Sequence, residues 1–215
     1  MERSQAINKQ LGHSKHWYMA TPSLSDFIWP WCLISLLGAS SGTYFTYAYG
    51  ITPKEWIDRE NLRFWTGPSF YMNYCLVWFW IYKVVSMIQI LKKETTWESY
   101  RVCVIRDIFT TFAFWATYNI FEWISKRLLT FTISGHSFVL VVISSMILFE
   151  AETNYRLTYN ELMIYIGKGV IAYNYYIFFW TCFAFHTLSH TVMGLVVGFT
   201  ITYFVYFRMD KIRIT

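Results

Sequence analysis

Residues 134–149 read SGHSFVLVVISSMILF, an apolar run with a polar start. A helix needs about 20 residues to cross the hydrocarbon layer of a bilayer. The clean apolar part, from Ser137 to Phe149, is shorter than that, so a membrane helix here must begin near Thr132. This start brings three residues with chemical potential to the membrane boundary: Ser134, Gly135 and His136.

The rest of the chain fits the same environment. Of its 215 residues 55% are hydrophobic and 14% are charged, whereas soluble domains carry about 25% charged residues. We predict an all-α, polytopic membrane domain with six transmembrane helices. The polar N-terminal tail is 1–26, the six-helix membrane core is 27–207 and the C-terminal tail is 208–215. The predicted spans are 27–48, 70–91, 105–124, 137–149 with its extension to residue 132, 170–185 and 193–207.

The basic residues predict an orientation. Six crossings put both termini on one side of the bilayer. Of the 18 Lys and Arg residues, few fall on the other side: Lys54, Arg59, Arg63, Lys126 and Arg127. Because basic residues concentrate in cytosolic loops, we expect both termini to be cytosolic. The two histidine motifs, at His136 and at His186–His190, then share the non-cytosolic side.

The composition also disfavours several function classes. The net charge of +5 comes from basic residues spread over tails and short loops, so we expect no nucleic-acid partner. The four cysteines form no C-x-x-C pair and no zinc-finger spacing. The sequence has no glycine motif for nucleotides and no G-x-S-x-G motif of serine hydrolases. We expect no cofactor.

The motif Ser134-Gly135-His136 is a candidate anion site because it lies at the predicted start of a helix. Glycine allows close backbone approach, and the first N–H groups of a helix are free to bind an anion, aided by the helix dipole. The Ser134 hydroxyl and these groups could hold a phosphate while His136 protonates a leaving oxygen. The structural alternative is that Ser134 caps the helix and His136 binds a loop carbonyl.

His186 and His190 are four residues apart and would share one face of a helix. Three interpretations stay open. The pair could bind a metal, although membrane di-iron enzymes use many more His and carboxylate ligands than this chain offers, and we expect no metal. One histidine could be a nucleophile that attacks phosphorus and is oriented by its twin or by a carboxylate. Both could instead be polar contacts between membrane helices.

Carboxylates are scarce in the predicted membrane core. Glu122 lies at the non-cytosolic end of the third span, and a carboxylate at that depth needs a partner. It could orient one of the two boundary histidines, or it could pair with Lys126 four residues later. Arg106 and Asp107 lie at the cytosolic end of the same helix, far from the histidines, and are expected to be structural.

These features together resemble the fat storage-inducing transmembrane (FIT) family. The resemblance rests on six spans, Ser134-Gly135-His136 at the start of the fourth, and Phe185-His186-Thr187 with Gly194 eight residues beyond His186. Arg63-Phe-Trp-Thr and Arg106-Asp107 are weaker similarities. The FIT family is distantly similar to the lipid phosphate phosphatases, whose second motif ends in Ser-Gly-His and whose third supplies a nucleophilic histidine. The Lys/Arg-rich first motif of those phosphatases is not visible here.

The resemblance implies a metal-independent hydrolase of the endoplasmic-reticulum membrane. His186 would be the nucleophile that forms a phosphohistidine, His136 the general acid, and Ser134 and Gly135 would help to hold the phosphate. The implied reaction cleaves the phosphoanhydride of fatty acyl-CoA on the luminal side and supports lipid-droplet formation and lipid homeostasis. The basic residues of Lys211–Thr215 could act as a retrieval signal for that compartment. The alternative is a non-catalytic membrane protein that binds or partitions the neutral lipids diacylglycerol and triacylglycerol.

Overall fold

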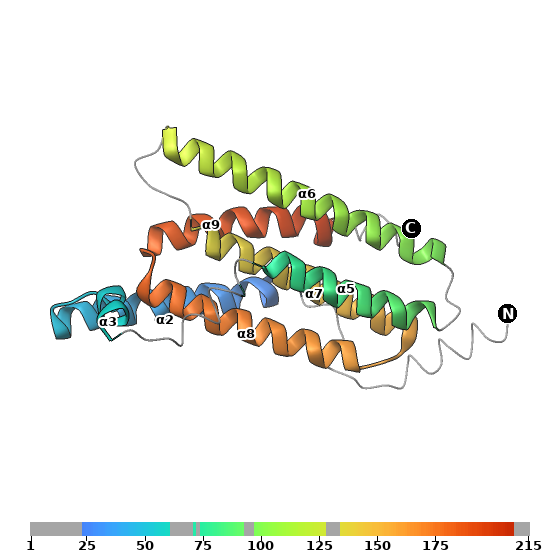
Figure 1. Ribbon diagram of the computed structural model, residues 1–215, viewed down its shortest axis with the longest axis horizontal. Helices are drawn as coiled ribbons and strands as arrows, with labels where there is room; N and C mark the ends of the chain where they lie inside the picture. The colour runs from blue at the N-terminus through green and yellow to red at the C-terminus, as the bar shows by residue number, and fades with distance from the viewer. Residues whose placement is uncertain (1–22, 61–70, 72–73, 93–96, 128–133, 209–215) are drawn as a thin grey trace.

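The computed structural model describes residues 23–60, 71, 74–92, 97–127 and 134–208. Every regular element in these ranges is a helix (Figure 1), which confirms the predicted all-α fold class. The helices are α2 (Leu24–Tyr49), α3 (Pro53–Arg59), α5 (Cys75–Leu91), α6 (Trp97–Arg127), α7 (Gly135–Thr158), α8 (Leu162–Ala184), α9 (Leu188–Thr202) and the π-helix η2 (Tyr203–Arg208). Most of the predicted N-terminal tail, the motif that starts at Arg63 and the basic stretch Lys211–Thr215 lie outside the described residues.

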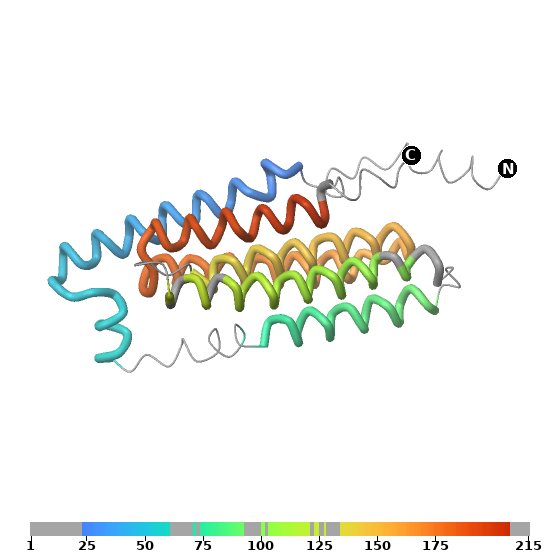
Figure 2. The backbone as a smooth tube through the Cα atoms, turned by 90° about the horizontal axis from the view of Figure 1, so that it is seen from above, coloured from blue at the N-terminus to red at the C-terminus, as the bar shows by residue number. Residues whose placement is uncertain are grey.

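Helix α7 is the centre of the bundle. Its side chains are buried on all sides over most of its length, as expected for an apolar helix that other helices surround. Helices α5, α8 and α9 pack along it, and α2 packs against α8 and α9. Figure 2 shows α2 and α9 on one side of the bundle and α5 on the other, while α6 follows the upper face in Figure 1.

Three described helices are long and apolar enough to cross a bilayer: α7, α8 and the continuous segment Leu188–Tyr206 of α9 and η2. Helix α5 is apolar but has 17 residues, fewer than the about 20 that a crossing needs. Helices α2 and α6 have 26 and 31 residues but lack the sustained apolar composition. The described part of the chain therefore has three candidate spans, and the six-span topology with cytosolic termini stays a prediction.

The helices extend beyond the predicted spans at their polar ends. Helix α6 begins at Trp97 rather than near residue 105, and α7 continues past Phe149 to Thr158. The continuation of α7 contains Glu150 and Asn154, both fully buried. A span predicted from hydropathy stops at such polar residues. The folded helix includes them because they form hydrogen bonds with polar groups inside the bundle.

Two glycine pairs lie at close helix contacts: Gly38 and Gly42 in α2, and Gly194 and Gly198 in α9. A Cβ atom on Gly42 would collide with the Phe183 carbonyl oxygen of α8. One on Gly194 would lie 2.5 Å from the Ser134 carbonyl oxygen at the start of α7. Small residues four apart let membrane helices approach closely, so α9 is held directly against the first turn of α7.

Candidate active site

The site is built on the first turn of α7. Ser134 is the N-cap, and its side-chain oxygen accepts hydrogen bonds from the backbone N–H of Ser137 at 3.3 Å and from the Ser137 hydroxyl at 2.9 Å. Ser134 is 1% exposed. This capping satisfies one of the free N–H groups of the helix start. The structural alternative for Ser134 is therefore present in the geometry, and phosphate binding by Ser134 stays a prediction.

The connection between α8 and α9 reaches the same turn. The backbone N–H groups of Phe185 and His186 both donate to the Thr181 carbonyl oxygen, at 3.1 and 3.2 Å, and α9 starts after the N-cap Thr187. The Ser134 N–H in turn donates to the carbonyl oxygen of a residue in the first turn of α9, His190, at 3.2 Å. This route carries the His186 side chain to the start of α7.

His136 and His186 meet at this junction. Nδ1 of His136 lies 3.1 Å from Nε2 of His186, and the ring centroids are 5.4 Å apart. At this distance the two ring nitrogens share one N–H···N hydrogen bond, which one ring donates and the other accepts. Two residues that are 50 positions apart in the sequence are thus brought within reach of one ligand.

His186 is held as a neutral ring. Its pKa is lowered to about 4, chiefly because burial disfavours the charged form, and also because charged His136 and His190 would repel it. Imidazole must be neutral to attack phosphorus, since the protonated ring has no free lone pair. At neutral pH the environment of His186 therefore keeps it in the form that a nucleophile requires.

His190 lies beside this pair, with its ring centroid 6.5 Å from that of His186 and the ring planes at 70°. Among the described residues, no three His, Cys, Asp or Glu side chains gather as metal ligands would. The side chains of Glu122 and Lys126 lie outside the described residues. Whether Glu122 orients a histidine or pairs with Lys126 stays open.

The histidine pair opens onto a cavity of about 380 Å³ between α5, α6 and α7. Its lining is apolar apart from the two histidines and a tyrosine, and consists of Cys75, Leu76, Phe114, Tyr118, Gly135, His136, Val139 and His186. Gly135 lies directly against the Tyr118 ring, which a Cβ atom at this position would approach to 3.0 Å. The sequence pointed to Gly135 and the histidines, but it carried no signal for the walls that α5 and α6 supply.

His186 also borders a second hollow, a groove of about 940 Å³ between α2, α3 and the α8–α9 connection. Hydroxyl and aromatic side chains dominate this groove, and no Lys, Arg, Asp or Glu lines it among the described residues. Two helix ends shape it: α2 ends at Gly50, whose φ is +67°, and α3 starts with a capping box of Thr52 and Glu55. Both volumes fall in the usual range of ligand sites.

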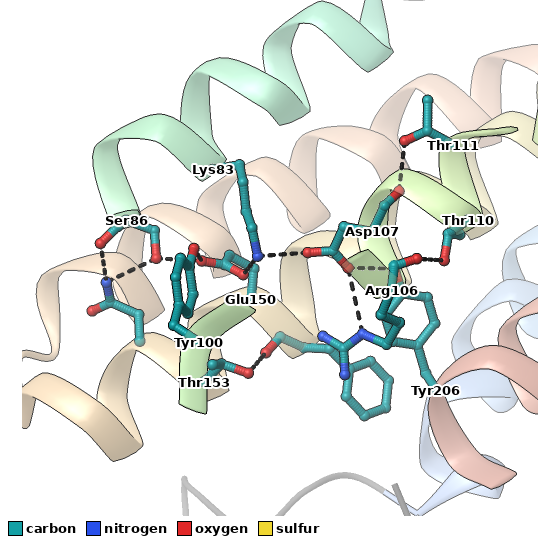
Figure 3. Close-up of polar contacts among 12 residues, drawn as sticks. Lys83, Ser86, Tyr100, Arg106, Asp107, Thr110, Thr111, Glu150, Thr153 and Tyr206 are labelled. Atoms are coloured by element: carbon teal, nitrogen blue, oxygen red, sulfur yellow. Dashed lines mark hydrogen bonds and ion pairs between the residues drawn. The ribbon is translucent and has the colours of Figure 1, made fainter. Parts of the chain in front are cut away.

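A separate polar cluster lies further along α7. Lys83 of α5 donates through Nζ to the Asp107 carboxylate of α6 at 2.6 Å and also to the Glu150 carboxylate of α7. Figure 3 shows Lys83 between the two acids. The three side chains are at most 3% exposed. With a rise of 1.5 Å per residue, Glu150 lies about 20 Å along α7 from His136.

Neighbouring hydroxyl groups complete this cluster. Glu150 accepts from the hydroxyls of Ser86 and Tyr100, the latter at 2.7 Å, while Asp107 accepts from the Tyr206 hydroxyl at 3.1 Å. Arg106 Nε lies 3.4 Å from Asp107. The cluster therefore joins α5, α6 and α7 by ionic contacts, and η2 by the Tyr206 hydrogen bond, far from the histidines.

Two residues of this cluster correct the charge count that predicts the orientation. The count leaves Lys83 and Arg106 on the cytosolic side, because neither is among the five basic residues placed on the other side. In the structure they are 2% and 7% exposed and face the bundle interior. The positive-inside argument concerns residues in loops, so it now rests on the remaining basic residues. Arg106 and Asp107 do lie remote from the histidines, as expected.

Comparison of this chain with protein-family models, with curated proteins and with solved structures finds no match.

Proposed function

We propose that this protein is a hydrolase of the endoplasmic-reticulum membrane that cleaves the phosphoanhydride of fatty acyl-CoA and supports lipid-droplet formation. In this proposal the chain crosses the membrane six times, both termini are cytosolic, and the histidine pair faces the lumen. The 3.1 Å contact between His136 and His186 at the mouth of a cavity carries the proposal. A nucleophile and a proton donor within reach of one phosphate are what a metal-independent, two-histidine hydrolase requires.

The shared hydrogen bond assigns opposite properties to the outer nitrogens of the two rings. With both rings neutral, two tautomers satisfy the bond. If His186 donates through Nε2–H, its Nδ1 keeps a free lone pair, and His136, which accepts on Nδ1, carries its proton on Nε2. This tautomer equips His186 as the nucleophile and His136 as the acid, in the roles that the resemblance to the FIT family implies.

The reaction then proceeds without a net change of charge on the pair. His186 Nδ1 attacks phosphorus, an N–P bond forms, and the bond from phosphorus to the bridging oxygen breaks. The leaving oxygen takes the Nε2 proton of His136, while His136 Nδ1 takes the Nε2 proton of His186. In the second step water attacks phosphorus, the N–P bond breaks, and the protons return along the same path.

This mechanism is tested by trapping the intermediate. The purified protein is mixed with ³²P-labelled acyl-CoA, and the reaction is quenched rapidly without acid. We expect phosphohistidine at residue 186, with the phosphate attached through Nδ1 rather than Nε2. Peptide mapping locates the residue and NMR of the peptide identifies the nitrogen. Phosphate on Nε2 would contradict the tautomer argument but keep the nucleophile, and phosphate on another residue would reject His186.

Turnover measurements test the two roles. We expect His136→Ala to lower kcat by roughly 10²–10⁴-fold, because a general acid contributes about that much, and His186→Ala to abolish cleavage. His190→Ala is the comparison, a neighbouring histidine that lines neither hollow: retained activity would exclude an orienting role for His190, and a partial loss would assign it that role. Unchanged turnover in both the His136 and the His186 variant would end the proposal.

The apolar lining of the cavity by Leu76, Phe114 and Val139 favours one competing function, binding or partitioning of diacylglycerol and triacylglycerol without catalysis. Lipid-droplet budding in cells separates the two. The hydrolase requires His186, so His186→Ala should block budding. If that variant buds normally while Val139→Trp, which fills the cavity, does not, lipid binding is the function.

A further inference from the structure

His186 borders two hollows that are lined by different types of residue. The 380 Å³ cavity between α5, α6 and α7 is lined mainly by apolar side chains such as Leu76, Phe114 and Val139. The 940 Å³ groove between α2, α3 and the α8–α9 connection is lined mainly by hydroxyl and aromatic groups, among them Thr43 and Tyr47. His186 lines both hollows, whereas His136 lines the cavity, so a ligand held at His186 lies at the border between the two.

The substrate of the proposed function is divided in the same way. The diphosphate of an acyl-CoA joins a nucleotide, which carries an aromatic base and a ribose, to a pantetheine arm that ends in the acyl chain. If the diphosphate lies at His136 and His186, the two halves must leave the histidines in different directions.

We propose, on the basis of the proposed function, that the groove is the nucleotide subsite and the cavity is the subsite of the pantetheine–acyl half, with the phosphoanhydride at His186 between them. Aromatic rings such as Tyr44, Tyr47 and Phe185 offer stacking surfaces for a base. The hydroxyl groups of Tyr44 and Tyr47 can donate to ribose or phosphate oxygens, and Thr43, whose O–H donates to the Ala39 carbonyl oxygen, can still accept from a ribose hydroxyl.

Large apolar side chains are exposed next to the cavity-lining residues of α5 and α6. Val77 and Trp78 follow the lining residues Cys75 and Leu76 on α5, and Trp115 follows Phe114 on α6; all three are more than 40% exposed. Large apolar side chains on the outside of a membrane domain face lipid tails. In the six-span topology of the proposed function, an acyl chain that leaves the cavity past these side chains therefore stays in an apolar environment. The aromatic and hydroxyl groups of the groove are suited to a base and a ribose.

The charge of the groove adds a specific expectation. Because no Lys or Arg lines it among the described residues, the 3′-phosphate of CoA should gain little from binding there. Acyl-dephospho-CoA, which lacks this phosphate, should therefore have a KM within about twofold of that of acyl-CoA. The loss of one charge-assisted hydrogen bond would raise KM by much more than that. A tenfold or larger rise in KM would refute the nucleotide subsite.

Photolabelling locates the two halves without requiring turnover. The probes are palmitoyl-CoA analogues with a methylene bridge in place of the bridging diphosphate oxygen, carrying either an azide on the adenine or a diazirine on the acyl chain near the thioester. We expect the adenine probe to label peptides that contain residues 39–47 or 183–188, and the acyl probe to label peptides that contain residues 75–76, 114–118 or 139.

A matched pair of variants sharpens this assignment. Thr43 and Thr200 are both exposed and both donate to the carbonyl four residues earlier, at 2.9 and 2.8 Å, but Thr43 alone lines the groove. Thr43→Phe should reduce adenine labelling roughly tenfold, a change of about 1.4 kcal/mol in binding. Thr200→Phe should leave it unchanged.

The outcomes separate this inference from the proposed function. Exchange of the two labelling patterns, labelling of one hollow by both probes, or equal effects of the two threonine variants would overturn the subsites. If the expected labelling occurs but the wild-type protein cleaves no acyl-CoA, the subsites stand and the hydrolase proposal fails. If cleavage depends on His186 but the groove is not labelled, the hydrolase stands and the nucleotide subsite fails.

Discussion

Replacing Lys83 by methionine probes the buried cluster that joins α5, α6 and α7. Lys83 Nζ bridges the carboxylates of Asp107 and Glu150, and its side chain is 3% exposed against 0% for each acid. Methionine fills a similar volume but removes the charge, so the carboxylates are left in the apolar interior with one positive charge fewer. Removing one partner of a buried ion pair costs about 3–5 kcal/mol. At about 2–4 °C per kcal/mol for a chain of this size, Tm should fall by about 6–20 °C.

A double-mutant cycle shows whether the cost comes from charge imbalance. Glu150→Gln alone leaves Lys83 with one acid fewer and should also destabilise the protein. The double variant Lys83→Met/Glu150→Gln restores neutrality, and the glutamine carbonyl can still accept from Ser86 and Tyr100, which now donate to Glu150. We therefore expect the double variant to cost less than the sum of the single variants, by about 1–3 kcal/mol.

The assay is reversible unfolding in lipid bicelles, followed by steric trapping, with thermal unfolding as a second measurement. Arg156→Met is the matched control, because Arg156 pairs with Glu152 in an i,i+4 contact and its side chain is 63% exposed. Such a pair contributes about 0.3–0.5 kcal/mol. Additive costs in the cycle, or a Lys83→Met cost no larger than that of Arg156→Met, would refute the ionic account of the cluster.

Three further predictions concern the site. Gly194→Ala should cost about 1–3 kcal/mol, because its Cβ would lie 2.5 Å from a backbone oxygen, whereas Gly169→Ala, with nothing within 4 Å of the added atom, should cost nothing measurable in thermal unfolding. Ser134→Ala should cost about 0.5–2 kcal/mol through the lost cap of α7, and Thr187→Ala less, since Thr187 makes no side-chain cap bond. In an NMR titration His186 should titrate near pH 4 rather than 6.5. Between these values the unfolded chain takes up a proton that the folded chain does not, so stability falls as the pH falls through this window; a midpoint at 6.5 would contradict the neutral ring that the proposed mechanism requires.

The start of α7 could be predicted because its signals are local. A serine before an apolar run predicts a helix start, and the structure places Ser134 at the N-cap of α7. The sequence also identified both members of the histidine pair. Beside their contact, Gly194 lets α9 approach the start of α7. The pairs Gly38/Gly42 and Gly194/Gly198 are visible as small residues four apart in apolar runs, so this approach could have been anticipated from the sequence.

The ionic cluster was harder to predict because its partners are distant in sequence. Lys83 lies 24 residues from Asp107 and 67 from Glu150. Lys83 interrupts the apolar run 75–91, and Glu150 closes the run of α7. Such positions indicate an interior partner, but hydropathy treats both residues as the edges of spans. The walls of the cavity carry even less signal, since residues such as Leu76 and Phe114 are ordinary apolar residues until the helices are packed.

The ionic cluster and the histidine site lie at different positions along α7, so substitutions in them should have different effects. The ionic cluster fixes α5 and α6 to α7 about 20 Å from His136, while near the histidines the same helices contact α7 through apolar groups. Phe114 stacks on Phe138 with ring centroids 5.0 Å apart, and the Tyr118 ring lies against Gly135. Contacts of this kind are non-directional and adapt to a ligand at less cost than a buried ion pair. Substitutions in the cluster should therefore act on stability, and substitutions at the cavity wall should act on substrate affinity, although both sets lie on the same three helices.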